Sequence, residues 1–146
     1  EQQADHIANI PTPASRDGYA YISLVTEEKL QPGVKLSTCC AFRTLKSLGA
    51  HVAFGGLDRM NPFSGLQKAV LREGKEALSV EEALEVWTSG GAWTGFQEDA
   101  LGRLQPGYQA DLAVLDRDLF TLPPEELHTL RPVLTMGSGR VLHREI

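Results

Sequence analysis

The 146-residue sequence lacks the features that define several large classes of protein. Its two cysteines are adjacent, Cys39 and Cys40, so it has neither a disulfide framework nor a paired-cysteine zinc site. No apolar run approaches the roughly 18 residues that a membrane-spanning helix needs. Basic residues are not in excess, because 14 Lys and Arg stand against 19 Asp and Glu, and they are scattered along the chain. Without a basic stripe, nucleic acid is excluded as an expected partner, and so is a membrane.

The remaining composition is that of a globular protein. Hydrophobic residues make up 42% and charged residues 23% of the chain, which is enough for one domain with a modest core. The adjacent cysteines are expected to be small buried hydrophobic residues on a helix. Residues 1–5 are polar and do not have the basic start and apolar stretch of a signal peptide. A cytoplasmic location is therefore the expectation.

The segment from residue 34 to 74 has the pattern of a helix, a strand and a second helix. Apolar residues three and four positions apart predict an amphipathic helix over 34–48, and Gly49 suits its left-handed C-cap. The apolar residues of that face are Leu36, Cys40, Ala41, Leu45 and Leu48. The short run 50–54 is typical of a buried parallel strand. Segment 19–25 fits a strand or part of a helix, and the two alternatives stay open.

Further along, capping signals mark two more helices. Asn61 as N-cap and Pro62 at the first helical position predict a helix that ends at Gly74. Ser79 and Glu82 form the sequence pattern of a capping box. The glycines at positions 90 and 91 allow close packing or end that helix, and close packing is favoured.

After Asp99 the pattern changes to short strands and turns. Residues 101–104 and 110–116 are predicted strands, with Pro106-Gly107 at the centre of a type II turn. Residues 133–136 and 140–143 flank a glycine-containing turn, which indicates a hairpin. Between these pairs, 123–127 is typical of a single helical turn.

The residues after Gly90 carry a long, ordered motif. It runs through Gly102-Arg103-Leu104-Gln105-Pro106-Gly107 and Ala110-Asp111-Leu112-Ala113-Val114-Leu115-Asp116. This pattern resembles the amidohydrolase superfamily, and the amidohydrolase-3 group within it, which is similar to N-acyl-amino-acid and N-substituted formamide hydrolases. The resemblance covers residues 27–146, including segments 40–45 and 49–55.

The resemblance implies an α+β chain with two parts. Residues 1–98 would be a remnant of the last unit or units of a (β/α)₈ barrel: a helix-strand-helix segment plus one more helix. Residues 99–146 would form a small antiparallel, sandwich-like part. Because a complete barrel takes about 250 residues, the chain has room for one or two barrel units.

The same resemblance supplies the candidate site. The family carries a metal-binding aspartate after the last barrel strand, where this sequence has Leu57, so Asp58, one residue later, is the catalytic and metal-ligand candidate. His6 is a second metal candidate. The alternative interpretation of Asp58 is an acidic side chain in a solvent-exposed loop. His51 is expected to be packed or partly exposed rather than a metal ligand. His128 and His143 are expected to lie far from the barrel mouth.

Two functions follow from these expectations. The first is the C-terminal portion of a metal-dependent amidohydrolase acting on non-peptide C–N bonds. Since the family's H-x-H pair and most of its histidines have no counterpart, we expect no cofactor in this chain alone and zinc or a similar ion in the intact family. The second is a non-catalytic module that self-associates. The expected partners are accordingly another copy of the chain or a missing N-terminal barrel portion.

Overall fold

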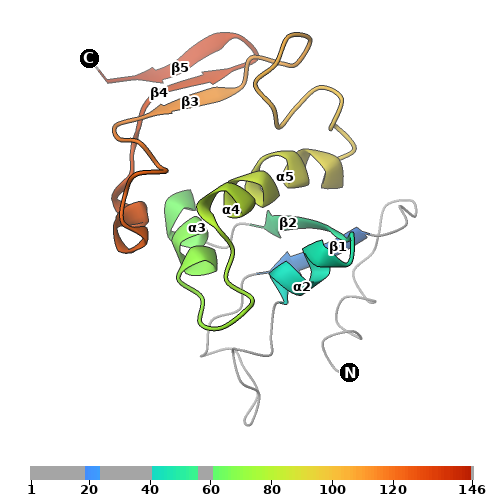
Figure 1. Cartoon of the computed structure of the whole chain (residues 1–146). Helices are drawn as coiled ribbons and strands as arrows, with labels where there is room; N and C mark the ends of the chain where they lie inside the picture. Colours follow the sequence, from blue (N-terminus) through green and yellow to red (C-terminus); the bar gives the residue numbers. More distant parts are fainter. Residues whose placement is uncertain (1–18, 24–40, 56–60, 146) are drawn as a thin grey trace.

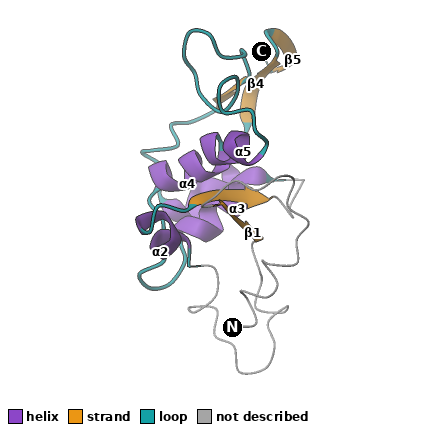
Figure 2. Cartoon of the chain, turned by 90° about the vertical axis from the view of Figure 1, so that its right-hand side faces the viewer, coloured by secondary structure: helices purple, strands orange, loops and turns teal. Residues whose placement is uncertain are grey.

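The computed structural model describes residues 19–23, 41–55 and 61–145, which form two sheets and a group of helices (Figure 1). In chain order the elements are β1 (Tyr19–Ser23), α2 (Phe42–Ser47), β2 (His51–Gly55), α3 (Pro62–Val70), α4 (Val80–Trp87), α5 (Ser89–Thr94), β3 (Leu112–Leu115), the 3₁₀ helix η3 (Pro124–Thr129), β4 (Pro132–Gly137) and β5 (Arg140–Arg144). Figure 2 shows α4 and α5 between the two sheets. The α+β class with a small antiparallel sheet is confirmed.

The first sheet is a parallel pair. β1 lies beside β2 with Tyr19 opposite His51 and Ser23 opposite Gly55. Parallel neighbours require a crossover connection, and α2 lies in the connection between these strands. Segment 19–25, for which the sequence allowed a strand or a helix, therefore contains a strand.

Strand β2 is buried against helices, as the apolar run at 50–54 predicts. Val52 and Ala53 are 4% and 3% exposed. The Phe54 ring lies edge-on to the rings of Phe42 in α2 and Trp87 in α4, at centroid distances of 5.3 and 6.1 Å. Aromatic pairs at such distances prefer this geometry, so these contacts fix one face of β2 against two helices.

The end of α2 is confirmed, but its predicted apolar face is partly wrong. Gly49 has φ +81°, and the amides of Gly49 and Ala50 donate to the carbonyls of Lys46 and Leu45 at 2.9 and 3.0 Å, which is a Schellman end. However, Leu48 is 77% exposed, whereas Phe42, outside the predicted face, is fully buried. The pair Cys39-Cys40 lies outside the described residues.

A distant carboxylate supplies the N-terminal cap of α2. Ala41 at the N-cap has no side chain for this purpose, and Glu76, only 5% exposed, accepts hydrogen bonds from the backbone amide and the hydroxyl of Thr44. Burial raises the pKa of Glu76, but the bonds from Thr44 and the charges of Lys75 and Arg72 outweigh it and hold that pKa below its usual value. Glu76 is therefore an ionised, buried cap.

Helices α3 and α4 begin where their capping residues predict. Asn61 accepts from two amides of the first turn of α3, and the reciprocal bonds of the Ser79–Glu82 capping box are both present. Glu82 also accepts from Arg43, which connects α4 to α2. In contrast, α3 ends at Val70 rather than at Gly74, because Gly74, with φ +82°, belongs to the turn that follows.

Of the two functions that the sequence allowed for Gly90 and Gly91, close packing is confirmed, whereas neither glycine ends a helix, because both lie inside α5. The backbone breaks at Thr88 and α5 begins at Ser89. Within α5, a Cβ at position 90 would lie 2.3 Å from the carbonyl oxygen of Val52, whereas one at position 91 would meet nothing within 4 Å. Gly90 thus lets α5 contact the backbone of β2 directly.

The antiparallel sheet contains the predicted hairpin. Its order is β3-β4-β5, and β4 and β5 are joined by Ser138-Gly139, both with positive φ, as a type I′ turn requires. The Pro106-Gly107 turn is also confirmed, since Gly107 has φ +95° and the Tyr108 amide donates to Gln105 O at 3.1 Å.

The predicted strand at 101–104 is wrong. This segment is a series of bends in the structure. Gly102 has φ +83°, and a Cβ there would lie 2.9 Å from atoms of Thr88, Ser89 and Ala92. The glycine of the motif therefore allows the loop to pack against the α4–α5 junction, and a left-handed residue does not continue a strand.

We expect Gly90→Ala to destabilise the protein by about 1–3 kcal/mol, because the new methyl group overlaps the Val52 carbonyl. The matched control is Gly91→Ala, one residue along the same helix, which should be neutral or stabilise by about 0.5–1 kcal/mol. Urea unfolding followed by circular dichroism gives both free energies. Equal effects of the two substitutions would contradict the close contact between α5 and β2.

We expect stability to fall below the ordinary pKa of Glu76, 4.5. A carboxyl whose pKa is lowered by folding stabilises the native state above its unfolded pKa, and this contribution is lost as the pH drops through the folded value. Glu76→Gln should therefore flatten the fall in the free energy of unfolding between about pH 5 and pH 3. The exposed Glu73 offers the control, and a Glu73→Gln variant that flattens the profile equally would refute the assignment.

Candidate functional site

The two candidate site residues, His6 and Asp58, lie outside the described residues. The structure defines the two ends of the short segment that carries Asp58. Strand β2 ends at Gly55, and α3 begins after its N-cap, Asn61. Asp58 therefore follows the carboxyl end of a strand in a parallel pair, which is the edge where α/β proteins place functional side chains.

Asn61 holds the far end of this segment in place. Its Oδ1 accepts from the amides of Phe63 and Ser64 at 3.0 and 3.3 Å. Its Nδ2 donates to the carbonyl oxygen of His128 at 2.8 Å. One side chain thus caps α3 and connects it to η3.

The packing of α3 on η3 strengthens this connection. Gln67 Nε2 donates to Pro124 O at 3.1 Å and lies 2.9 Å from Nδ1 of His128. Leu66 and Leu127 are buried in the common core. From the sequence, His128 is expected to lie far from the barrel mouth. The structure instead places it beside the start of α3. Only the capping signal at Asn61 was visible in the sequence, since contacts across about 60 residues leave no local pattern.

The described residues do not by themselves fit a metal centre. Within residues 19–23, 41–55 and 61–145, no three His, Cys, Asp or Glu side chains are grouped so that they could hold an ion. A catalytic zinc takes about three protein ligands. The ring of His51 stacks on Trp93 with 3.9 Å between centroids and 5° between planes, as expected for a packed histidine, although the residue as a whole is exposed.

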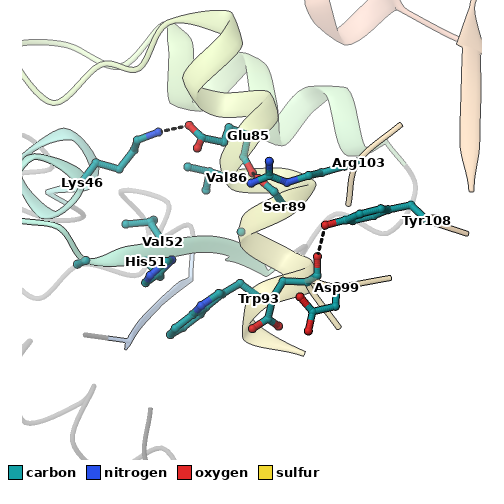
Figure 3. Close-up of a pocket in the computed structure, with 13 residues that line it drawn as sticks. Lys46, His51, Val52, Glu85, Val86, Ser89, Trp93, Asp99, Arg103 and Tyr108 are labelled. Carbon is teal, nitrogen blue, oxygen red and sulfur yellow. Dashed lines mark hydrogen bonds and ion pairs between the residues drawn. The ribbon is translucent and has the colours of Figure 1, made fainter. Parts of the chain in front are cut away.

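A pocket of about 340 Å³ lies at the opposite end of β2 (Figure 3). It is formed by the start of the strand, the α4–α5 junction and the loop that follows α5. Its lining residues are Lys46, Ala50, His51, Val52, Glu85, Val86, Ser89, Gly90, Trp93, Glu98, Asp99, Arg103 and Tyr108. It therefore lies at the amino end of β2, away from the segment that carries Asp58.

Two polar contacts within the fold lie around this pocket. Lys46 pairs with Glu85 at the rim, and the Tyr108 hydroxyl donates to the backbone oxygen of Glu98 at 2.8 Å. Barrel enzymes carry out their chemistry at the carboxyl ends of the strands. If β2 is a barrel strand, this pocket is not the active site.

The shifted carboxyl pKa values in the described part indicate structural roles. Hydrogen bonds from backbone amides are the main cause that lowers the pKa of Glu82 and of Asp116, through Ser79 and Arg131 respectively. The Asp116 bond measures 3.0 Å. A general acid needs a pKa near the working pH, whereas these carboxyls stay ionised and bound to the backbone.

None of the described helices has the length and apolar character needed to cross a membrane.

Comparisons with known proteins agree on one family. The model of the amidohydrolase family, amidohydrolase-3 group, matches residues 9–143. YtcJ of Bacillus subtilis (strain 168), which is named as an amidohydrolase, is 31% identical over 125 residues, or 76% of this chain and 24% of YtcJ. The chain thus spans about a quarter of the length of this curated relative.

Two solved structures have a similar fold. A crystal structure of an amidohydrolase from Thermotoga maritima MSB8 matches with a TM-score of 0.54 and 21% identity, over 70% of this chain and 25% of that one. A second amidohydrolase crystal structure gives 0.53 and 26% identity, over 71% and 25%. With the family match over nearly the whole sequence, the chain belongs to the amidohydrolase family.

Proposed function

We propose that this chain is the C-terminal portion of a metal-dependent amidohydrolase that hydrolyses non-peptide, amide-type C–N bonds. One observation carries the proposal. The segment with Asp58 directly follows the carboxyl end of β2, which is paired in parallel with β1, and barrel enzymes place catalytic residues at this position.

In this proposal β1 and β2 are the last two strands of a (β/α)₈ barrel. Residues 1–98 belong to the barrel and residues 99–146 to a small β-sandwich. The crossover through α2 and the cover of α4 and α5 on β2 support the first assignment, since barrel strands alternate with helices on their outer side. The β3-β4-β5 sheet supports the second, as sandwiches are built from antiparallel sheets.

We propose that this chain supplies only part of the metal centre. Zinc or a similar divalent ion is the cofactor that family membership implies, and such ions supply an activated water. The described residues contain no ligand group for it, and His6 and Asp58 are two candidates where about three ligands are needed. We therefore propose that the remaining ligands come from the rest of a longer enzyme.

A second candidate function is a non-catalytic, cytoplasmic module that self-associates as a homodimer. Exposed apolar side chains favour it, with Leu104 and Leu142 76% and 73% exposed. Apolar surface of this kind often marks interfaces. The two functions differ in whether Asp58 matters for hydrolysis.

The test is a hybrid enzyme in which this chain replaces the matching quarter of YtcJ. We expect the zinc-loaded hybrid to hydrolyse members of a panel of N-acyl amino acids and N-substituted formamides. Asp58→Asn should lower kcat/KM by about 100-fold or more, as the loss of a catalytic carboxylate does. Asp99→Asn, at the amino end of β2, serves as the control and should leave kcat/KM within about threefold.

An active hybrid in which the Asp58→Asn and Asp99→Asn variants behave alike would contradict the catalytic assignment. Since the chain is covalently part of the hybrid, the comparison does not depend on association between separate polypeptides. Thermal unfolding of both variants shows whether a loss of activity reflects a loss of folding.

A further inference from the structure

The 3₁₀ helix η3, from the C-terminal part of the chain, is built into the packing of α3. Leu127 of η3 is fully buried, and Leu130, just after η3, is 3% exposed. Both belong to the core that also contains Val52 of β2 and Leu66 of α3. Figure 1 shows η3, in dark orange, beside α3. A distant segment of the chain therefore packs on the helix that follows Asp58 and shares a core with the strand that precedes it.

Two amide side chains donate hydrogen bonds across this contact. At the start of α3, Asn61 Nδ2 donates to His128 O at 2.8 Å. Further along α3, Gln67 Nε2 donates to the carbonyl oxygens of Pro124 and Glu125 at 3.1 and 2.5 Å. Pro124 is the first residue of η3 and His128 the last but one, so the bonds hold both ends of η3. A shift of α3 along η3 would break at least one of them.

The other side of η3 is fixed to the three-stranded sheet. The guanidinium of Arg117, just after β3, donates to the backbone and hydroxyl oxygens of Thr129 at 3.0 and 2.6 Å. The carboxylate of Asp116 accepts from the amide of Arg131 at 3.0 Å, and the Asp116 amide donates to Arg131 O at 3.0 Å. The start of α3 is thus connected through η3 to the end of β3.

The sequence places Asp58 between two residues whose positions this packing fixes. It follows Gly55, the last residue of β2, by three positions and precedes Asn61 by three. Three residues of chain reach at most about 11 Å, so the position of Asn61 limits where the backbone of Asp58 can lie. In enzymes, a misplacement of about 1 Å can cost about 100-fold in rate. Small shifts of α3 on η3 would therefore matter for a catalytic group at position 58.

We propose that η3 positions the catalytic carboxylate, with Asn61 and Gln67 as positioning residues that act through Asp58. This inference rests on the proposed function, in which Asp58 is catalytic. The two amide side chains fix the start of α3 on η3, and the short connection passes this constraint to Asp58. The C-terminal part of the chain thereby takes part in hydrolysis without contributing a reacting group.

The substitution Asn61→Asp separates the two roles of this side chain. An aspartate caps a helix about as well as an asparagine, so α3 keeps its N-cap, but a carboxylate has no hydrogen to donate to His128 O and repels it. In the hybrid with YtcJ we expect this variant to fold and to bind zinc as the parent hybrid does. Its kcat should fall about tenfold or more, while KM changes by less than about threefold.

A second pair of variants tests the other amide. Gln67→Met keeps the length and the helix propensity of the side chain but loses its donors to η3, so kcat should fall by about threefold or more. Lys68→Met, at the next and exposed position of α3, is the matched control and should leave kcat within about twofold. Circular dichroism and zinc content show whether each variant is folded. If Asn61→Asp does not fold, the Gln67→Met variant takes its place in the comparisons that follow.

A double-mutant cycle tests whether Asn61 acts through Asp58. If it does, adding Asn61→Asp to the Asp58→Asn hybrid lowers kcat by less than about twofold beyond Asp58→Asn alone. A loss of folded enzyme would instead multiply with the effect of Asp58→Asn. A further tenfold or larger fall in the double variant would therefore overturn the inference.

The remaining outcomes separate this inference from the proposed function. An Asn61→Asp variant with unchanged kcat, in a hybrid that Asp58→Asn inactivates, would overturn the positioning role and leave the proposed function intact. Equal losses in Gln67→Met and Lys68→Met would remove Gln67 from that role. An active hybrid that is insensitive to Asp58→Asn would contradict the proposed function, and the inference that rests on it would fall as well.

Discussion

The described structure depends on the burial of one short strand, β2. Aromatic rings of α2 and α4 pack on Phe54, and the backbone of α5 contacts the Val52 carbonyl through Gly90. Parallel strands are normally covered on both faces, and these contacts cover β2 within the part of the chain that the structure describes. They also hold β2 up to Gly55, after which the segment with Asp58 follows in the sequence.

The two sheets leave different surfaces incomplete. A two-stranded sheet is marginal in isolation, and β1–β2 is stabilised mainly by its helices. The antiparallel sheet is paired in the order β3-β4-β5, and in the described structure its side chains Val114 and Val141 are 48% and 52% exposed. Both deficits fit a chain that spans a quarter of its relatives. In our account the rest of a longer enzyme supplies the other metal ligands.

Local signals predicted more of the fold than of the site. The caps at Asn61 and Ser79, the helix end at Gly49 and the Ser138-Gly139 hairpin depend on neighbouring residues, so the sequence shows them. The Glu76 cap on α2 joins positions 32 residues apart, and no local pattern reveals it. The strand predicted at 101–104 failed because the motif glycine serves a tertiary contact. The candidate site residues, His6 and Asp58, lie outside the described part, so their roles stay predictions.

The most direct measurement is the metal content of the purified chain and of the hybrid after equilibration with zinc and removal of free ions. Our account predicts about one or more zinc ions per hybrid molecule and far less than one per isolated chain, because a catalytic site takes about three ligands. An isolated chain that retains about one zinc ion and hydrolyses amides in an Asp58-dependent manner would contradict it.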